Sequence, residues 1–587
     1  MKYKYPAVTF LLAFISFICS ADDAKPTHVM VKAPAAKSAI AEQQGLTPIK
    51  FMPGLFIGTT TASEALSQEL GSTVERVPGS YEELEVSAAS MLLKTPDDAT
   101  SPISNWWKAG FTGTSAIIGI LDSGVPDNYA TDTQSFIRQS GLRDKNMIVN
   151  RGDNSGFDKY LNGVRTPHGT GVACIYGNEQ SERPGIAHGV QNMLVTLAGD
   201  STVDDTDWAL TLVNLDWLLE TPNQIKPTTI NYSFGNGDVT ENWSTVAQTV
   251  DYIVHHYGVT WVKSAGNSGW VAPSDEAPYA NTMSIPADSY NAIVVANMNN
   301  TLQKTSTSVT KTSDRSQHYI QSTSSRGPTF DGRRKPDITA PGNDTRTCAP
   351  DQTVYAVPEN PTFSPYAASM QYDAVSETRL AGGTSMATPH VGGASALIYD
   401  SGITEPMAIK ALLINSADAW TDSDQQDPAS HHAVPGSLWN RTYGWGYINM
   451  DNAFKQKEFV KREKIHPRRM MCYSGELSPN DKVTLVWERR VSTDNGEILL
   501  HDLTPMTLRL YQAKGHVLLD EDVSVIDNVL QVNHTGTDTS RTMLEISIAD
   551  GAQIDGARYE PFALASGKAL RREVCRDVIA QPPTPRG

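Results

Sequence analysis

The chain has 587 residues, of which 39% are apolar and 19% are charged. This length and composition indicate an ordinary globular protein that can bury a large core and that has several domains. The formal net charge of −17 and the lack of a basic stripe in the sequence argue against a nucleic-acid partner, because binding to a phosphate backbone requires positive charge.

The first residues predict a signal peptide at 1–21. Lys2 and Lys4 precede an apolar run from Ala7 to Cys19, and the small residues Ser20-Ala21 follow. The run is shorter than the about 20 residues that a membrane helix needs, and no later segment of the sequence qualifies. We expect a secreted, extracellular protein without a membrane span. The periplasm or the cell surface, and an uncleaved anchor, are the alternatives.

Four cysteines remain after the signal peptide, and an even number in an exported chain favours disulfides. Cys472 and Cys575 bracket the last region, so we expect them to pair. Cys174 with Cys348 is the remaining pair, and a free buried thiol at Cys174 is the alternative.

Residues 22–98 predict a small α/β unit. Strands are expected at Val29–Val31, Leu55–Ile57 and Val74–Val77, with an alanine-rich helix after the first and a second helix at Ala62–Leu70. The polar stretch Asp97–Pro102 is expected to be an exposed linker.

Residues 99–460 alternate apolar runs with helical patterns, such as those at 207–219 and 244–257. Runs that are apolar on both faces are typical of parallel strands covered by helices. The runs are Ala116–Leu121, Met193–Val195, Thr229–Ser233, Thr260–Val262 and Ala292–Val295. Residues 465–587 change to short alternating strands with turns at Asp494-Asn495-Gly496 and Lys514-Gly515, which predicts an antiparallel β-sandwich. Its strands are expected at Val483–Trp487, Thr507–Tyr511, Val529–Val532 and Leu544–Ile548.

A serine in a glycine turn precedes a long helical pattern. Gly382 and Gly383 come before Ser385, and Val391–Tyr399 continue the helix. We expect the helix to begin near Ser385, because Pro389 would then escape most of the cost of lacking an N–H. The hydroxyl would lie at the positive end of the helix dipole, although a serine in this position is more often a simple N-cap.

Three other polar residues are expected at the carboxyl edge of the parallel sheet, where ligands collect. Asp122 follows a strand, His168 starts a helix, and Asn267 follows the strand that ends at Val262. Each taken alone has a structural explanation, as a turn aspartate, a hydrogen-bonded histidine or a turn asparagine.

Together the four residues supply what acyl transfer needs. Ser385 would attack a carbonyl, and His168 would take its proton and return it to the leaving amine. Asp122 would hold His168 in the required tautomer, and the Asn267 amide with the Ser385 N–H would donate to the oxyanion.

These motifs resemble those of the subtilisin-like serine proteases (subtilases, peptidase family S8), which share the order Asp122, His168, Ser385. The matching stretches are Ile120–Val125, His168–Thr170, Ser264–Asn267, Ser324–Pro328, Lys335–Gly342, Gly383–His390 and Gly444–Asn449. Gly171 stands where the family motif has a second, non-catalytic histidine, and the segment 342–383 is longer than expected.

The resemblance implies an α/β protein whose parallel-sheet catalytic domain lies between an N-terminal α/β propeptide and the C-terminal antiparallel β-sandwich. The propeptide at 22–98 would aid folding, inhibit the enzyme, and be removed by self-cleavage around residues 85–105. Ser233-Phe234-Gly235 would bind an extended substrate by strand addition. Ser264-Ala265-Gly266 would form a wall of the first specificity pocket.

We therefore expect a secreted serine endopeptidase that acts on protein or peptide substrates through an acyl-enzyme. No cofactor is required by this interpretation, no residue is assigned to a metal, and structural calcium with unknown ligands stays open. A catalytically silent binding protein on the same fold and an esterase or acyl transferase with the same triad are the alternatives. The C-terminal region is interpreted as a stabilising module in preference to a substrate-binding one, and the sequence carries no signal for an oligomeric state.

Overall fold

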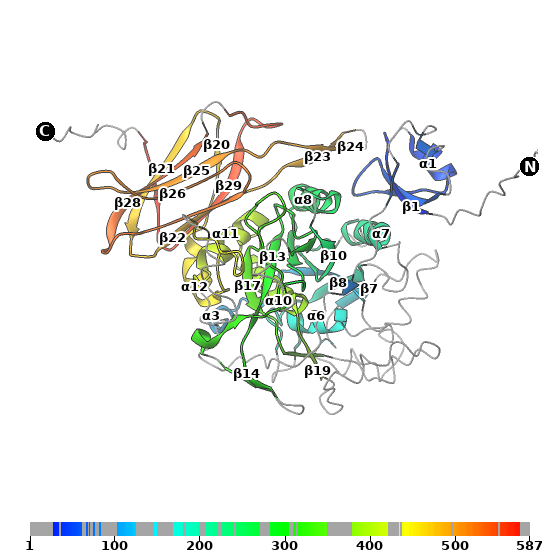
Figure 1. Ribbon diagram of the computed structural model, residues 1–587, viewed down its shortest axis with the longest axis horizontal. Helices are drawn as coiled ribbons and strands as arrows, with labels where there is room; N and C mark the ends of the chain where they lie inside the picture. The colour runs from blue at the N-terminus through cyan, green and yellow to red at the C-terminus, as the bar shows by residue number, and fades with distance from the viewer. Residues whose placement is uncertain are drawn as a thin grey trace, which may run out of the picture.

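A computed structural model describes most of the chain, apart from its two ends and several connecting segments (Figure 1). The described residues are 27–34, 37–60, 66–67, 70, 74–76, 82–83, 103–124, 142, 146–149, 168–179, 184–198, 207–220, 225–239, 242–269, 282–304, 309–312, 314–348, 378–420, 434, 437–494, 497–549 and 552–575. The expected signal peptide, the linker at 97–102 and most of the expected cleavage range lie outside them.

A largely parallel sheet forms the centre of the molecule. In spatial order its strands are β16 (Tyr319–Ile320), β13 (Ile293–Asn299), β11 (Thr260–Ser264), β9 (Thr229–Tyr232), β6 (Ile117–Asp122), β8 (Asn192–Leu197) and β7 (Asn146–Val149), with β17 (Ile338–Pro341) paired to β13. Their pairing is parallel except between β13 and β16. The prediction of a parallel sheet is confirmed. β11 runs on to Ser264, past its expected end at Val262, because Ser264 still pairs with Val295.

Helices cover both faces of this sheet. They are α3 (Ser104–Lys108), α6 (His168–Gly177), α7 (Asp207–Leu219), α8 (Thr245–Tyr257), α10 (Thr384–Asp400), α11 (Pro406–Ser416) and α12 (Met450–Gln456), with short 3-10 turns η2 (Arg315–Gln317) and η6 (Lys457–Phe459). Ile120 and Val195 pack with α6 and α10, whereas their neighbours Leu121 and Leu194 pack with α7 and α8. Alternate residues are therefore buried on opposite faces, which explains the continuous apolar runs.

The N-terminal unit is an antiparallel sheet with one described helix. Its elements are β1 (Thr27–Lys32), α1 (Ser38–Gln43), β2 (Thr47–Ile49), β3 (Leu55–Thr60) and β4 (Val74–Arg76), in the sheet order β2-β3-β1-β4. The three expected strands correspond to β1, β3 and β4, and the second expected helix lies largely outside the described residues.

This unit packs against helices α7 and α8 (Figure 1). The Phe51 N–H donates to Oδ1 of Asp216 on α7 at 2.9 Å, and the Tyr257 hydroxyl on α8 donates to Phe51 O at 3.3 Å. The buried side chains of Met30 and Ile57 belong to the same apolar cluster as both helices.

The C-terminal region consists of two antiparallel sheets that share one apolar cluster. One sheet has the order β20 (Lys461–Ile465), β29 (Glu560–Ser566), β22 (Lys482–Trp487) and β27 (Val529–Asn533), and the other has the order β26 (Val517–Ser524), β25 (Met506–Gln512), β28 (Ser540–Ile548), β21 (Met470–Leu477) and β30 (Arg571–Glu573). The four expected strands lie within β22, β25, β27 and β28. A hairpin of β23 (Val491–Asp494) and β24 (Glu497–Leu500) extends from these sheets toward α8 (Figure 1). Its residue Val491 belongs to the same apolar cluster as residues of α8.

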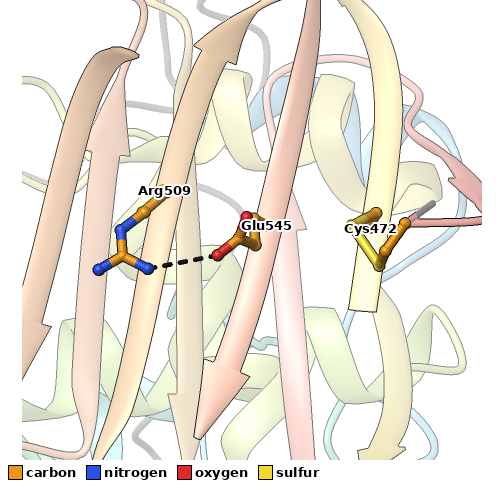
Figure 2. The surroundings of a disulfide bond; sticks show 4 residues. Cys472, Arg509 and Glu545 are labelled. Carbon is orange, nitrogen blue, oxygen red and sulfur yellow. Dashed lines mark hydrogen bonds and ion pairs between the residues drawn. A yellow bond between two sulfur atoms is a disulfide. The ribbon is translucent and has the colours of Figure 1, made fainter. Parts of the chain in front are cut away.

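Both expected cysteine pairs are disulfides. Cys472 on β21 is joined to Cys575, with Cα atoms 5.3 Å apart, beside the ion pair of Arg509 and Glu545 on the neighbouring strands (Figure 2). Cys174 on α6 is joined to Cys348 on β18 (Thr345–Cys348), with Cα atoms 5.9 Å apart, so the alternative of a free thiol is wrong. No helix in the described part of the chain is long and apolar enough to cross a bilayer.

Candidate active site

The last residue of β6 and the first residue of α6 meet at the carboxyl edge of the sheet. Oδ1 of Asp122 lies 2.6 Å from Nδ1 of His168, and both side chains are fully buried. The same carboxylate oxygen accepts from the Ser123 N–H at 2.7 Å. A carboxylate at Nδ1 keeps the ring proton on that nitrogen and makes Nε2 the basic one.

Gly169 permits this close approach. A Cβ on Gly169 would lie 2.4 Å from Gly124 O and 3.1 Å from Oδ1 of Asp122, so a larger residue would push α6 away from β6. The Gly169 N–H donates to Oγ of Ser123 at 2.9 Å, which joins the start of the helix to the end of the strand.

Ser385 lies in the first turn of α10. The preceding Gly383 has a φ of 117°, a conformation that favours glycine, and the helix begins at Thr384. Oγ of Ser385 donates to Ser233 O at 3.0 Å, and Oγ of Ser233 donates to Ser385 O at 2.9 Å. The serine is thus held at the positive end of the helix dipole by two reciprocal bonds.

Pro389 lies deeper in the helix than the sequence suggested. With α10 starting at Thr384, Pro389 is past the first turn, and it has no N–H to donate to Ser385 O. That carbonyl accepts from Oγ of Ser233 instead. The proline is therefore tolerated because a side chain on another segment replaces the missing helical bond.

Asn267 lies beside the first residue of α10. Its Oδ1 accepts from the Thr384 N–H at 3.0 Å and from Oγ1 of Thr384 at 3.1 Å. Both bonds engage the amide oxygen, and the other end of the side chain is an NH₂ group, a donor of the kind that an oxyanion site requires.

Strand β10 (Phe234–Asp238) follows directly after Ser233. The ring of Phe234 packs edge-on against His168, with centroids 5.7 Å apart, so the segment 233–235 touches both His168 and Ser385. β10 pairs on one edge with β12 (Ser284–Ile285) and on the other, antiparallel, with β5 (Glu82–Glu83). The N-terminal part of the chain thus lies along the edge that was expected to bind an extended peptide.

Ser264, Ala265 and Gly266 lie at the end of β11, across from β10. Ala265 O accepts from the Ser284 N–H at 2.9 Å, and Gly266 has a φ of 116°. A Cβ on Gly235 would lie 2.3 Å from Oγ of Ser284, and one on Gly266 would lie 3.0 Å from it. Ser284 therefore sits between the two expected substrate-binding segments. Sequence reasoning missed it because no local pattern marks a contact between distant segments.

His390, in the serine motif, is structural. Its Nδ1 donates to Met386 O at 2.7 Å, and burial lowers the pKa of the imidazole to about 4, so that it is neutral at pH 7. Among the described residues, no group of three or more His, Cys, Asp or Glu side chains is arranged to hold a metal ion.

The part of the chain that contains Asp122, His168, Asn267 and Ser385 is similar to known proteins. The model of the subtilase family (Peptidase_S8) matches residues 113–446, more than half of the chain. Tripeptidyl-peptidase 2 of Drosophila melanogaster is 25% identical over 323 residues, which is 53% of this chain and 19% of that protein. Serine protease AprX of Bacillus subtilis (strain 168) is 30% identical over 192 residues, which is 32% of this chain and 36% of that protein. The chain thus spans about a fifth to a third of the length of these relatives.

Two solved structures are also similar. Fervidolysin from Fervidobacterium pennivorans, a keratinolytic enzyme related to subtilisin, has a TM-score of 0.48 at 14% identity, covering 94% of this chain and 92% of that chain. The prenylagaramide maturation protease PagA has a TM-score of 0.39 at 19% identity, covering 60% of this chain and 97% of that chain.

Proposed function

Because the chain belongs to the subtilase family, we propose that it is a serine endopeptidase with Asp122, His168 and Ser385 as its catalytic triad. The observation that carries this proposal is the buried contact of Asp122 with His168 at the edge of the sheet where Ser385 lies in the first turn of α10. Subtilases that have lost activity usually lack a member of the triad or the oxyanion residue, and the presence of Asp122, His168, Asn267 and Ser385 in this sequence supports an active enzyme.

The residues divide the chemistry as follows. His168 accepts the proton of the Ser385 hydroxyl through Nε2 while Oγ attacks the peptide carbonyl. Asp122 stabilises the imidazolium that results. The Asn267 amide and the Ser385 N–H donate to the oxyanion, which the dipole of α10 also favours. His168 then gives the proton to the leaving amine, and water hydrolyses the acyl-enzyme on Ser385.

Cleavage within a chain is favoured by the strand β5. Its backbone pairs with Phe234 and Gly235, although residues 82–83 are preceded and followed by long stretches of the same chain. A site that accepts an internal segment in this way does not require a free N-terminus. Release of tripeptides, as the name of the relative tripeptidyl-peptidase 2 suggests, is the alternative that the experiment below separates.

The same pairing supports the proposal that residues 22–98 form a propeptide, processed by the enzyme itself around residues 85–105. Docking on α7 and α8 through Phe51 and pairing along β10 would block substrate access until the connection is cut. We expect an Ser385→Ala precursor, expressed without other proteases, to stay uncut while the wild-type precursor matures. N-terminal mass mapping of both proteins tests this, and it also tests the proposed export and signal cleavage. Maturation of the variant would mean processing in trans, and full activity with residues 22–98 attached would contradict the propeptide proposal.

Labelling with a fluorophosphonate probe tests the enzyme proposal itself. We expect the mature protein to be labelled at Ser385, and Ser385→Ala to lose labelling and about 10⁶-fold in turnover, the loss known for the nucleophile of subtilisin. A folded wild-type protein that is not labelled would support the silent binding protein instead.

A substrate panel separates the remaining activities. Internally quenched peptides with blocked N-termini should be cleaved by an endopeptidase, whereas a tripeptidyl-peptidase needs the free amine. Matched esters show whether the protein is mainly an esterase, and added amine nucleophiles reveal acyl transfer. Cleavage of unblocked peptides alone would overturn the endopeptidase proposal.

A further inference from the structure

The polar side chain of Ser284 lies between the two expected substrate-binding segments, 233–235 and 264–266. Oγ of Ser284 is close enough to both Gly235 and Gly266 that a Cβ on either glycine would collide with it. The side chain is almost fully buried, at 4% exposure. A substrate side chain that enters between β10 and the end of β11 would therefore meet the Ser284 hydroxyl.

A lysine lies directly behind this serine. Nζ of Lys263 donates to Oγ of Ser284 at 3.2 Å, to Oγ of Ser264 at 3.1 Å, and to Ser264 O. The lysine is fully buried on β11. The hydroxyl groups of Ser264 and Ser284 thus both accept from the same amino group.

This amino group has no acidic partner in the described part of the chain, where no carboxylate forms an ion pair with Lys263. The carboxylate that acts on it electrostatically is Asp288, which instead accepts from the Ser244 N–H at 2.6 Å and from Oγ of Ser244 at 3.0 Å. Burial lowers the pKa of Lys263 well below its ordinary range. Burial thus disfavours the ammonium form of Lys263, and a carboxylate brought next to the amino group would favour that form again.

We propose that Ser284 and Lys263 make the first specificity pocket shallow and selective for short acidic side chains, aspartate above all. This inference rests on the proposed peptidase function and names its substrate class. Ser284 excludes rings and long aliphatic chains by occupying the depth of the pocket. The hydroxyls of Ser264 and Ser284 donate to the incoming carboxylate, that of Ser284 in place of its 3.4 Å bond to Ala265 O, and Lys263 supplies the compensating charge.

The test uses blocked peptides that differ only in the residue before the cleaved bond: Asp, Asn, Ala, Leu or Phe. We expect kcat/KM for Asp to exceed that for the isosteric Asn and for Leu by at least about tenfold, because a charge matched in a buried site discriminates more strongly than size alone. A preference for Leu or Phe over Asp would overturn the inference.

Two variants separate shape from charge. Ser284→Gly should raise kcat/KM for Phe at least about tenfold by deepening the pocket, and Lys263→Met should bring the Asp-to-Asn ratio close to one. The matched control Lys410→Met removes another buried amine, on α11, and should leave that ratio unchanged; an equal change in the control would contradict the role of Lys263. If Lys263→Met fails to fold, the comparison of kcat/KM for the Asp, Asn and Leu peptides with the wild-type enzyme still tests the preference for an acidic side chain.

Active enzyme in each sample is counted by fluorophosphonate labelling, which keeps two failures apart. A folded protein without labelling would contradict the proposed peptidase. A labelled protein that prefers large apolar side chains would contradict the acidic pocket and leave the peptidase intact.

Discussion

The carbonyl of Ser385 accepts from Oγ of Ser233, whereas Pro389 cannot donate to it. Ser233→Ala would remove this buried hydrogen bond, which costs about 1–3 kcal/mol. We expect a loss of stability of that size, measured by denaturant unfolding, together with reduced turnover because the serine turn loosens.

The same helix offers the control. Oγ of Ser395 donates to Val391 O, a carbonyl that also has a helical N–H within reach, so Ser395→Ala should cost well under about 1 kcal/mol. Equal losses in the two variants would show that the bond from Ser233 has no special role.

The proposed oxyanion role of Asn267 can be tested by a single substitution. Asn267→Leu keeps the volume and removes the NH₂ donor, so turnover should fall about 10²- to 10³-fold with little change in KM, the range known for such a donor in subtilisin. Asn415→Leu removes a buried amide on α11, away from the site, and should change turnover far less. A main effect of Asn267→Leu on KM would assign this residue to substrate binding.

At the scale of elements, the sequence predicts what is periodic and misses what depends on distant pairing. The strand before Asp122 and the helix at 207–219 carry a strong apolar pattern, and both form as expected. The strands β5, β10 and β12 are short and polar, and each exists because another segment lies beside it. Asp122 and His168 could be predicted as site residues because each lies in a recognisable local motif. The position of Ser284 and the bond from Ser233 that compensates for Pro389 could not be predicted, because both depend on contacts between distant segments.

The disulfide between Cys174 and Cys348 connects the elements that hold two of the proposed catalytic residues, His168 and Ser385. Cys174 is on α6, the helix that His168 begins, and β18 pairs with β19 (Thr378–Ala381), which leads into the serine turn. Replacing both cysteines by alanine should cost about 2–5 kcal/mol of stability and should lower turnover at temperatures where the protein is still folded.

The second disulfide serves as the matched control, since it lies wholly in the C-terminal sheets (Figure 2). Removing Cys472 and Cys575 should lower the melting temperature and leave turnover per labelled site unchanged. If both double variants lose turnover equally, α6 is not positioned by its disulfide.

On the scale of the whole molecule, Arg334 forms ion pairs between the region that contains the parallel sheet and the C-terminal sheets. Its guanidinium contacts Asp527 at 2.8 Å and Asp522 at 2.8 Å, and all three side chains are largely buried. Arg334→Met would leave two buried carboxylates without their cation, so we expect a loss of about 3–5 kcal/mol in unfolding experiments.

An exposed pair across the same boundary, Arg462 with Glu405, gives the comparison. Arg462→Met should cost under about 1 kcal/mol, because solvent screens the pair. A similar small loss for Arg334→Met would contradict a stabilising role of this contact between the two regions.

The pH dependence of the free energy of unfolding should reveal the lowered pKa of Lys335. Burial lowers its pKa to about 7 in the folded protein, despite the nearby Asp337, whereas an unfolded lysine titrates near about 10.4. Between these values the unfolded chain binds more protons, so this group makes the free energy of unfolding rise with pH, by up to about 1.4 kcal/mol per unit. The difference in unfolding free energy between wild type and Lys335→Met should therefore grow from pH 7 to pH 9. A difference independent of pH would contradict the lowered pKa.

Under the propeptide proposal, the pairing of β5 with β10 keeps the uncut protein inactive and determines how its inhibition depends on protein concentration. While the two strands belong to one continuous chain, the effective concentration of the blocking segment is of millimolar order, whatever the dilution. After the connecting peptide is cut, the same contact becomes a bimolecular equilibrium between two separate chains. Dilution should then restore activity to the cut form but not to the uncut form. Inhibition should therefore depend on protein concentration only after the connecting peptide bond has been cleaved.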